Sequence, residues 1–260
     1  MGAADSPDGP DRGDATVEDD TIPHSNETDT IPHSDETDAL DLMGSITAVS
    51  RVIFSDLLTI VWVSMLFALL SLPLLTLGAA MLAAVETLTT VITGEGRGGP
   101  TTERERIRVF LGSFRGHLSH GVPYSVVTVV VVATMVFYVL TASADETGLP
   151  FLGALMGLYA IVICFAWLLR AGSITIRSTE PVGFVDAARE AAYQAFSYPW
   201  YAAIQLITVG VILLVAFVVP PAYVLLVPGL LVVLEVVTFE ETEGQGAMTV
   251  VRAYRGEFEE

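Results

Sequence analysis

The stretch SLPLLTLGAAM, residues 71–81, lies at the middle of an almost uninterrupted apolar run over residues 52–93. As one straight helix, this run would measure about 63 Å at ~1.5 Å per residue. The hydrocarbon core of a bilayer is only about 30 Å thick and is crossed by about 20 residues. Pro73 lacks the N–H that a continuing helix needs, and it disfavours helical geometry in the preceding residue. The run therefore predicts two membrane spans, about 53–72 and 74–93, joined at Pro73.

Further apolar segments follow, and each is long enough to cross a bilayer. They cover about 121–141, 149–169, 201–219 and 222–239, and short polar or proline-containing turns separate the members of each pair. The expected fold is an all-α, polytopic transmembrane bundle of six spans, with amphipathic cytoplasmic helices between them. This membrane domain occupies residues 48–240 and is followed by a short cytoplasmic tail, 241–260.

Residues 1–47 form an acidic segment that differs in composition from the rest of the chain. Thirteen of the 30 acidic residues precede residue 51, against one base, Arg12, and large apolar side chains are scarce. Such a segment cannot bury enough apolar surface to offset its ordering entropy, so we expect a disordered tail. It contains a nine-residue tandem repeat, 21–29 and 30–38, which is too short to form a solenoid. It has neither the basic nor the apolar region of a signal peptide.

The charge composition is typical of a protein from a very salty cytoplasm, as in halophilic archaea. The net charge is −18, and all twelve basic residues are arginines. Molar salt shortens the Debye length to about 3 Å, so repulsion among the acids costs little there. A mesophilic protein with an acidic tail is the alternative. The single cysteine, Cys164, excludes an intrachain disulfide.

The distribution of arginines predicts the topology. With six spans, every arginine falls in the N-terminal tail with its lead-in, the 94–120 loop, the 170–200 loop or the C-terminal tail. The turns on the other side carry none. Because positive residues mark the cytoplasmic side, we expect both termini in the cytoplasm of a multi-pass protein of the cell membrane. A five-span alternative, with 52–93 as one kinked passage, would export the acidic tail.

Two amphipathic segments are expected on the cytoplasmic side. In the first, residues 102–117, one apolar stripe has helical spacing and three arginines lie on other faces. This basic helix suits the lipid headgroup layer, or it packs on the protein instead. The second segment, 182–196, presents another apolar stripe. The residues concerned are Ile107, Phe110, Leu111 and Phe114 with Arg104, Arg108 and Arg115 in the first segment, and Val185, Ala188, Ala192 and Phe196 in the second.

Small residues after Pro73 predict close helix packing. Gly78, Ala79 and Ala80 give the second span a face against which another membrane helix can approach closely. The Thr76 hydroxyl is placed to satisfy carbonyls that the Pro73 break leaves without partners. We interpret this motif as structural, with a binding or gating role as the alternative.

Residues 72–80 (LPLLTLGAA) resemble the first membrane hairpin of the YesL-like family, small integral membrane proteins built on a domain of unknown function. That family shows Leu-Pro-x-x-Thr-x-Gly-Ala-Ala there, followed by a Phe-containing basic helix that residues 109–117 resemble. Residues 184–201, before the last two spans, also have a shape similar to the family's, and the resemblance covers roughly 48–240. It implies bacterial members near carbohydrate-uptake genes and hence a link to sugar transport, but it supplies no catalytic or binding residues. Arginine in place of the usual lysine and the added acidic tail depart from the family.

Ionisable residues within membrane spans are the default functional candidates. Glu86 is the main one, because it lies ~10 Å from the end of its span by helix rise. We expect it to face the bundle interior and to pair with an arginine. Asp56 and Glu235 lie about one turn from the cytoplasmic ends, within reach of the headgroups. The expected partners of Glu86 are Arg51, Arg97, Arg115 and Arg170.

No enzyme motif, metal site or cofactor site is evident, and the sequence indicates no nucleic-acid partner. His117 and His120 are one turn apart without an accompanying acid, which is typical of interfacial histidines. We expect a non-enzymatic accessory or regulatory membrane protein, linked to carbohydrate uptake, with the bilayer and a membrane protein as partners. A small transporter or channel is the alternative, although no matched charged pair is evident at mid-membrane. A divergent sugar permease subunit would use residues 190–192 (EAA), but the expected nearby glycine is absent from 193–199.

Overall fold

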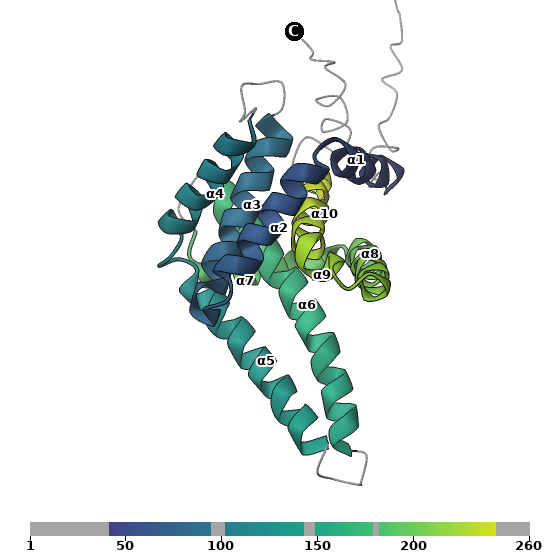
Figure 1. Cartoon of the computed structure of the whole chain (residues 1–260). Coiled ribbons are helices and arrows are strands. Elements are labelled where there is room, and N and C mark those ends of the chain that lie inside the picture. The colour runs from purple at the N-terminus through teal and green to yellow at the C-terminus, as the bar shows by residue number, and fades with distance from the viewer. Residues whose placement is uncertain (1–41, 95–101, 143–148, 179–181, 243–260) are drawn as a thin grey trace, which may run out of the picture. The chain divides into compact units, whose positions relative to one another are not determined.

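The computed structural model describes residues 42–94, 102–142, 149–178 and 182–242, and the regular structure in these ranges is helical (Figure 1). This confirms the all-α prediction for the described residues. The acidic tail, its repeat and the C-terminal tail lie outside them. The elements are α1 Leu42–Ser55, α2 Leu57–Leu70, the 3-10 turn η1 Leu74–Thr76, α3 Leu77–Gly94, α4 Glu103–Gly116, α5 Val122–Ala142, α6 Leu149–Arg177, α7 Phe184–Ser197, α8 Pro199–Val218, α9 Ala222–Leu225 and α10 Val227–Thr242.

The described residues hold three helices that are long and apolar enough to cross a membrane: Leu74–Thr93, Val122–Ala142 and Pro150–Arg177. The number rises to five if each of two bent helix pairs, Ile46–Ser55 with Leu57–Leu70 and Phe184–Ser197 with Ala202–Val218, is one span. Their length and composition are those of membrane-spanning helices. The count differs from the expected six because α2, with 14 residues, and α10, with 16, are shorter than a usual transmembrane helix.

The first apolar segment bends at Asp56, which the sequence did not indicate. The helices on its two sides meet at an angle of 84°. The Asp56 carboxylate accepts a hydrogen bond from Nη1 of Arg106 in α4, at 2.6 Å. This bond holds the bend against α4. The predicted span 53–72 therefore consists of the end of α1 and the whole of α2.

The break at Pro73 is as predicted. α2 ends at Leu70, Pro73 has an extended backbone, and α3 begins at Leu77. The Thr76 hydroxyl donates to the carbonyl oxygens of Leu70 and Pro73, the latter at 2.7 Å. Carbonyls that the break would leave unpaired are therefore satisfied within the turn.

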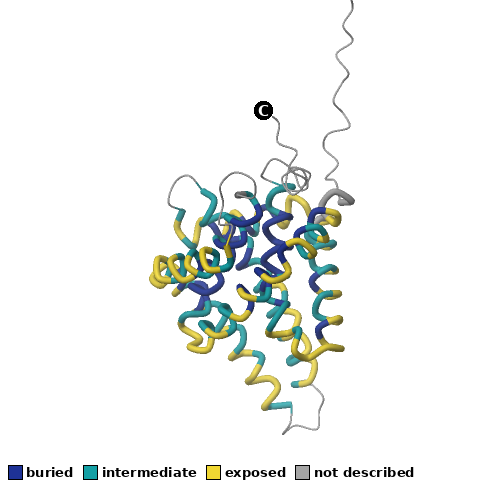
Figure 2. The backbone as a smooth tube through the Cα atoms, turned by 45° about the horizontal axis from the view of Figure 1, so that its top comes forward, coloured by how far each residue is buried: buried dark blue, intermediate teal, exposed yellow. Residues whose placement is uncertain are grey.

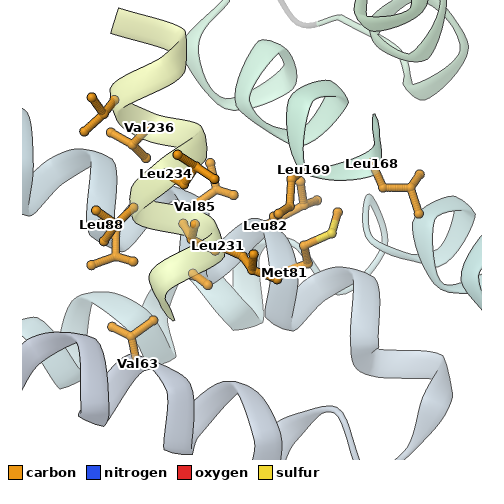
Figure 3. Packing of buried hydrophobic residues seen from close by; sticks show 14 of the residues in the cluster. Val63, Met81, Leu82, Val85, Leu88, Leu168, Leu169, Leu231, Leu234 and Val236 are labelled. Carbon is orange, nitrogen blue, oxygen red and sulfur yellow. The ribbon is translucent and has the colours of Figure 1, made fainter. Parts of the chain in front are cut away.

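The core forms around α3, which contacts α2, α4, α5, α6 and α10. Figure 2 shows the buried residues gathered toward the middle of the helical assembly, and Figure 3 shows how the side chains of neighbouring helices meet. These buried side chains include Met81, Leu82, Val85 and Leu88 of α3, Leu168 and Leu169 of α6, and Leu231, Leu234 and Val236 of α10.

The first small residues of α3 pack closely against the start of α5, and α3 also contacts α2. A Cβ atom on Gly78 would lie 2.0 Å from the carbonyl oxygen of Gly121. The Ser125 hydroxyl accepts from the Gly78 N–H at 2.8 Å and donates to the Leu75 carbonyl at 2.8 Å. Gly78 and Ala79 lie at this contact, and Gly78, Ala79 and Ala80 are all buried.

The same contact places the start of α5 beside the start of α3. In six alternating spans, the Pro73 turn and residues 121–125 would lie at opposite membrane faces. In the structure they meet, because α4 packs against α3 and brings the chain back toward the Pro73 turn. A capping box starts α4: the Thr102 hydroxyl accepts from the Glu105 N–H, and the Glu105 carboxylate accepts from the Thr102 N–H.

α5 and α6 pack against each other along a mostly exposed hairpin (Figure 1). Gly153 and Gly157 of α6 allow the close approach, since a Cβ on either would press on Tyr138 or Met135 of α5. This is the spacing of small residues at which membrane helices commonly pack, and sequence reasoning overlooked it.

Candidate functional site

Glu235 of α10 is completely buried at the junction of α6, α8 and α10. Its Oε1 atom lies 3.3 Å from Nη1 of Arg170 in α6, and its Oε2 atom accepts from Nε2 of Gln205 in α8, at 2.8 Å. A buried carboxylate is costly unless it is paired and hydrogen-bonded, and here two neighbouring helices supply both. The expectation that Glu235 reaches the headgroup layer is wrong, because the three helices enclose it.

Arg170 connects this carboxylate to a wider polar cluster. Its side chain is 11% exposed. Nε donates to Oε1 of Gln194 in α7 at 2.7 Å, and Nη2 donates to the Thr242 hydroxyl. The guanidinium carbon lies 4.8 Å from the centre of the Phe239 ring, a cation–π contact. Residues of α7 and α10 therefore hold this arginine of α6 in place.

Arg177 repeats this arrangement about two turns further along α6. It forms an ion pair with Glu240 of α10, and its guanidinium carbon lies 4.6 Å from the centre of the Phe239 ring. The two ion pairs run side by side between α6 and α10.

The polar residues around the buried carboxylate form one group with it. We name Arg170, Gln194, Gln205, Glu235 and Thr242 the Glu235 cluster.

A cavity of about 250 Å³ adjoins the Glu235 cluster. A second cavity, of about 220 Å³, lies on the other flank of α8 and is lined in part by α1. Gln205 and Thr238 line both, so the Gln205 amide stands between them. The first cavity is lined by the apolar residues Ile163, Ala166, Trp167, Ala191, Ala192, Ala195, Phe196, Ala202 and Leu206, and by the polar-tipped residues Arg170, Gln194, Tyr198, Gln205, Thr238 and Thr242.

Glu86, the leading candidate from the sequence, pairs with a histidine rather than with an arginine. Its Oε2 atom lies 2.7 Å from Nε2 of His117, and its side chain is 37% exposed. Of the expected partners, Arg97 lies outside the described residues, and the structure pairs Glu86 with His117 instead of Arg51, Arg115 or Arg170. The expectation that no acid accompanies His117 is wrong for the same reason. α4 packs against α3, and this brings His117 beside Glu86 across 31 positions of sequence.

Asp56 belongs to another buried ion pair, between α2 and α4. Arg106 bonds to the Asp56 carboxylate and to the Thr59 hydroxyl, and Glu103 lies 3.5 Å away. Asp56 is therefore held against α4 instead of reaching the headgroups as expected. This pair and the completely buried Phe110 fix α4 on the protein.

The outer face of α4 is basic. Arg104, Arg108 and Arg115 are exposed, and Leu111 is exposed among them. Their spacing of four and seven residues places the arginines on one face, which we name the α4 arginine stripe. The sequence left two positions open for this helix, in the lipid headgroup layer or packed on the protein. In the structure, its apolar side packs on the protein, where Phe114 is half-buried.

The buried face of α7 coincides only in part with the predicted apolar stripe, with which it shares Ala188. Its buried residues are Ala187, Ala188, Ala191 and Gln194, whereas Val185 is 72% exposed and Phe196 is 86% exposed. Small alanines let α7 approach α6 closely, and the Trp167 indole N–H donates to the Ala188 carbonyl at 2.9 Å. The large apolar side chains are left on the outside, as at a lipid-facing surface.

Comparison with known proteins identifies no relative: no family model matches the chain, and neither does a curated protein or a solved structure. The YesL-like resemblance thus depends on residues 72–80, 109–117 and 184–201 of this sequence. Over the described ranges, no group of three or more His, Cys, Asp or Glu side chains is placed to hold a metal ion.

Proposed function

We propose that this is an integral membrane protein in which the α5–α6 hairpin crosses the bilayer, with residues 143–148 outside and both termini in the cytoplasm. α5 has 21 residues, and the part of α6 before Arg170 is similarly long and apolar. α5 and this part of α6 carry no arginine, whereas the positive charge of the other described segments indicates the cytoplasmic side. The arginines of the described residues are Arg51, Arg104, Arg106, Arg108, Arg115, Arg170, Arg177 and Arg189.

The α2–α3 hairpin has two candidate positions. In a six-span protein, it crosses the bilayer and the Pro73 turn faces outside. In the alternative, the turn stays near the cytoplasmic leaflet, level with the start of α5. The contact of Gly78 with Gly121 and Ser125 supports the alternative.

Single-cysteine labelling tests both statements in a Cys164→Ser background. Ser143→Cys should react with an impermeant maleimide from outside and Gly98→Cys only from inside, under either arrangement. Ser71→Cys, next to the Pro73 turn, separates them. Labelling from outside would establish the six-span order and refute the alternative, while labelling of Gly98→Cys from outside would refute the topology altogether.

We further propose that the protein is an accessory or regulatory component that recruits a partner through the α4 arginine stripe. The supporting observation is that α4 is anchored by Phe110 and Arg106 while Arg104, Arg108 and Arg115 remain exposed. A fixed helix with this face suits an acidic cytoplasmic surface of another membrane protein. The YesL-like resemblance makes a carbohydrate-uptake component the first partner to examine.

Quantitative affinity purification from native membranes tests this role. The variant Arg104→Gln/Arg108→Gln/Arg115→Gln should lose a protein that the parent retains. The matched control is Arg189→Gln, which removes an exposed arginine from α7. A photo-crosslinking residue at the exposed Leu111 should capture the same protein, and one at the buried Phe110 should not. Equal recovery by the triple variant and the parent would refute the proposal.

A small transporter is the second candidate. It is favoured by the Glu235–Arg170 pair, a charged pair enclosed by three helices that sequence reasoning did not find. Reconstituted vesicles would separate the candidates. Saturable solute uptake by the isolated chain, lost in Glu235→Gln and kept in the triple α4 variant, would favour transport over an accessory role.

A further inference from the structure

We propose that the cavity between α6, α7 and α8 binds a single-chain amphiphile with an anionic headgroup. The headgroup would contact Arg170 and the chain would lie along Trp167 and Leu206. This binding site is independent of the accessory role of α4, since no residue of the α4 arginine stripe lines the cavity.

The walls of the cavity fit a hydrocarbon chain. Ile163 and Trp167 come from α6, Phe196 from α7 and Leu206 from α8, and alanines fill the positions between them. An apolar cavity of ~150 Å³ is enough to bind benzene. A volume of about 250 Å³ therefore accommodates a longer apolar group.

The polar end of the cavity presents hydrogen-bond donors. A guanidinium has five N–H groups, and the bonds of Arg170 to Gln194, Glu235 and Thr242 occupy three of them. Among the described residues, no acceptor is bonded to the other two, which are available to a ligand. Glu235 is completely buried and does not line the cavity, so the ion pair presents its positive member to a bound molecule.

The sign of the headgroup follows from the lining residues. Of the described residues that line the cavity, Arg170 is the charged one, and none of them carries a carboxylate. A cationic headgroup would face the Arg170 guanidinium, while the Glu235 carboxylate that pairs with it does not line the cavity. A carboxylate or phosphate would accept from Arg170 with the shorter, stronger hydrogen bonds of charged partners.

Trp167 provides a fluorescence readout, because it lines the cavity. In the variant Trp62→Phe/Trp200→Phe, Trp167 is the remaining tryptophan. Decanoate, decanol and decyltrimethylammonium share one chain and differ in headgroup, so each is titrated into the full chain in uncharged detergent. We expect a saturable change in Trp167 emission, tightest with decanoate, weaker with decanol and weakest with the cation.

A matched pair of variants on α8 locates the response. Ala202 lines the cavity, whereas the adjacent Ala203 is exposed and does not. Ala202→Phe should weaken decanoate binding by about tenfold or more, because the ring fills space that the chain needs. Ala203→Phe should bind like the parent and controls for added bulk on α8.

The ligand could come from the cytoplasm or be a membrane lipid. The decanoate titration is therefore repeated in nanodiscs of anionic lipid and in nanodiscs of zwitterionic lipid. A weaker response in the anionic nanodiscs would indicate that a lipid occupies the site, and an equal response would indicate a soluble amphiphile. Both results support the site. Equal responses to decanoate and decyltrimethylammonium, or equal weakening by the two alanine variants, would overturn it.

Discussion

Removal of the Arg170 charge gives the sharpest test of the Glu235 cluster. Arg170→Met keeps an unbranched chain in place but leaves the Glu235 carboxylate without its ion pair. Glu235 is 0% exposed and Arg170 is 11% exposed, so water cannot readily replace the guanidinium. Among the described residues, the hydrogen bond that the carboxylate would retain is the one from the Gln205 amide, at 2.8 Å.

The expected loss is about 3–5 kcal/mol in the free energy of unfolding, the usual cost of leaving one member of a buried ion pair unpaired. Arg170→Met also removes the hydrogen bonds to Gln194 and Thr242 and the contact with Phe239. Glu235→Gln disturbs fewer of these contacts and should therefore cost less than Arg170→Met.

A double-mutant cycle measured by reversible denaturation in detergent micelles separates these contributions. The cycle compares the parent, Arg170→Met, Glu235→Leu and the double variant. In the double variant, the unpaired carboxylate is gone, and a large part of the stability lost in Arg170→Met should return, because an apolar replacement of a buried ion pair is often close to neutral. A loss below about 1 kcal/mol for Arg170→Met, or a double variant whose loss equals the sum of the two single losses, would refute the reasoning.

Three further predictions concern other parts of the chain. Glu86→Gln should change the free energy of unfolding by only ~0–1 kcal/mol, since its pair with His117 is partly exposed; a loss above 3 kcal/mol on denaturation would contradict this. Gly78→Ala should lower the free energy of unfolding by about 1–3 kcal/mol through overpacking. Gly112→Ala should leave it unchanged or raise it in the same assay, because no neighbouring atom lies within 4 Å of the new Cβ. Deletion of residues 2–39 should leave the melting temperature unchanged, and a clear fall would show that this acidic segment stabilises the membrane domain.

Local chemistry in the sequence was enough to predict the helices and the break between α2 and α3. Pro73 cannot continue a helix, Thr76 can satisfy the freed carbonyls, and the apolar stripe around Phe110 has helical spacing. These features depend on residues only a few positions apart. That Gly78 needed a close neighbour could also be predicted, because a small residue allows one.

Which neighbours meet was decided by the tertiary structure. Gly78 packs on Gly121, and Glu86 pairs with His117, because α4 returns along α3; no local pattern specifies that path. The buried face of α7 likewise follows from the fit of its alanines to α6, whereas a hydrophobicity pattern favoured its larger side chains.

The Glu235 cluster shows the same division most clearly. The sequence by itself determined that an acid lies near the end of an apolar segment and that Arg170 follows another one. Only the packing of α6, α8 and α10 places Arg170 and Gln205 on that acid, across 65 and 30 positions of sequence. The physical reason is that a carboxylate can be buried only where a partner and hydrogen bonds are supplied in space, and that supply depends on how distant helices pack.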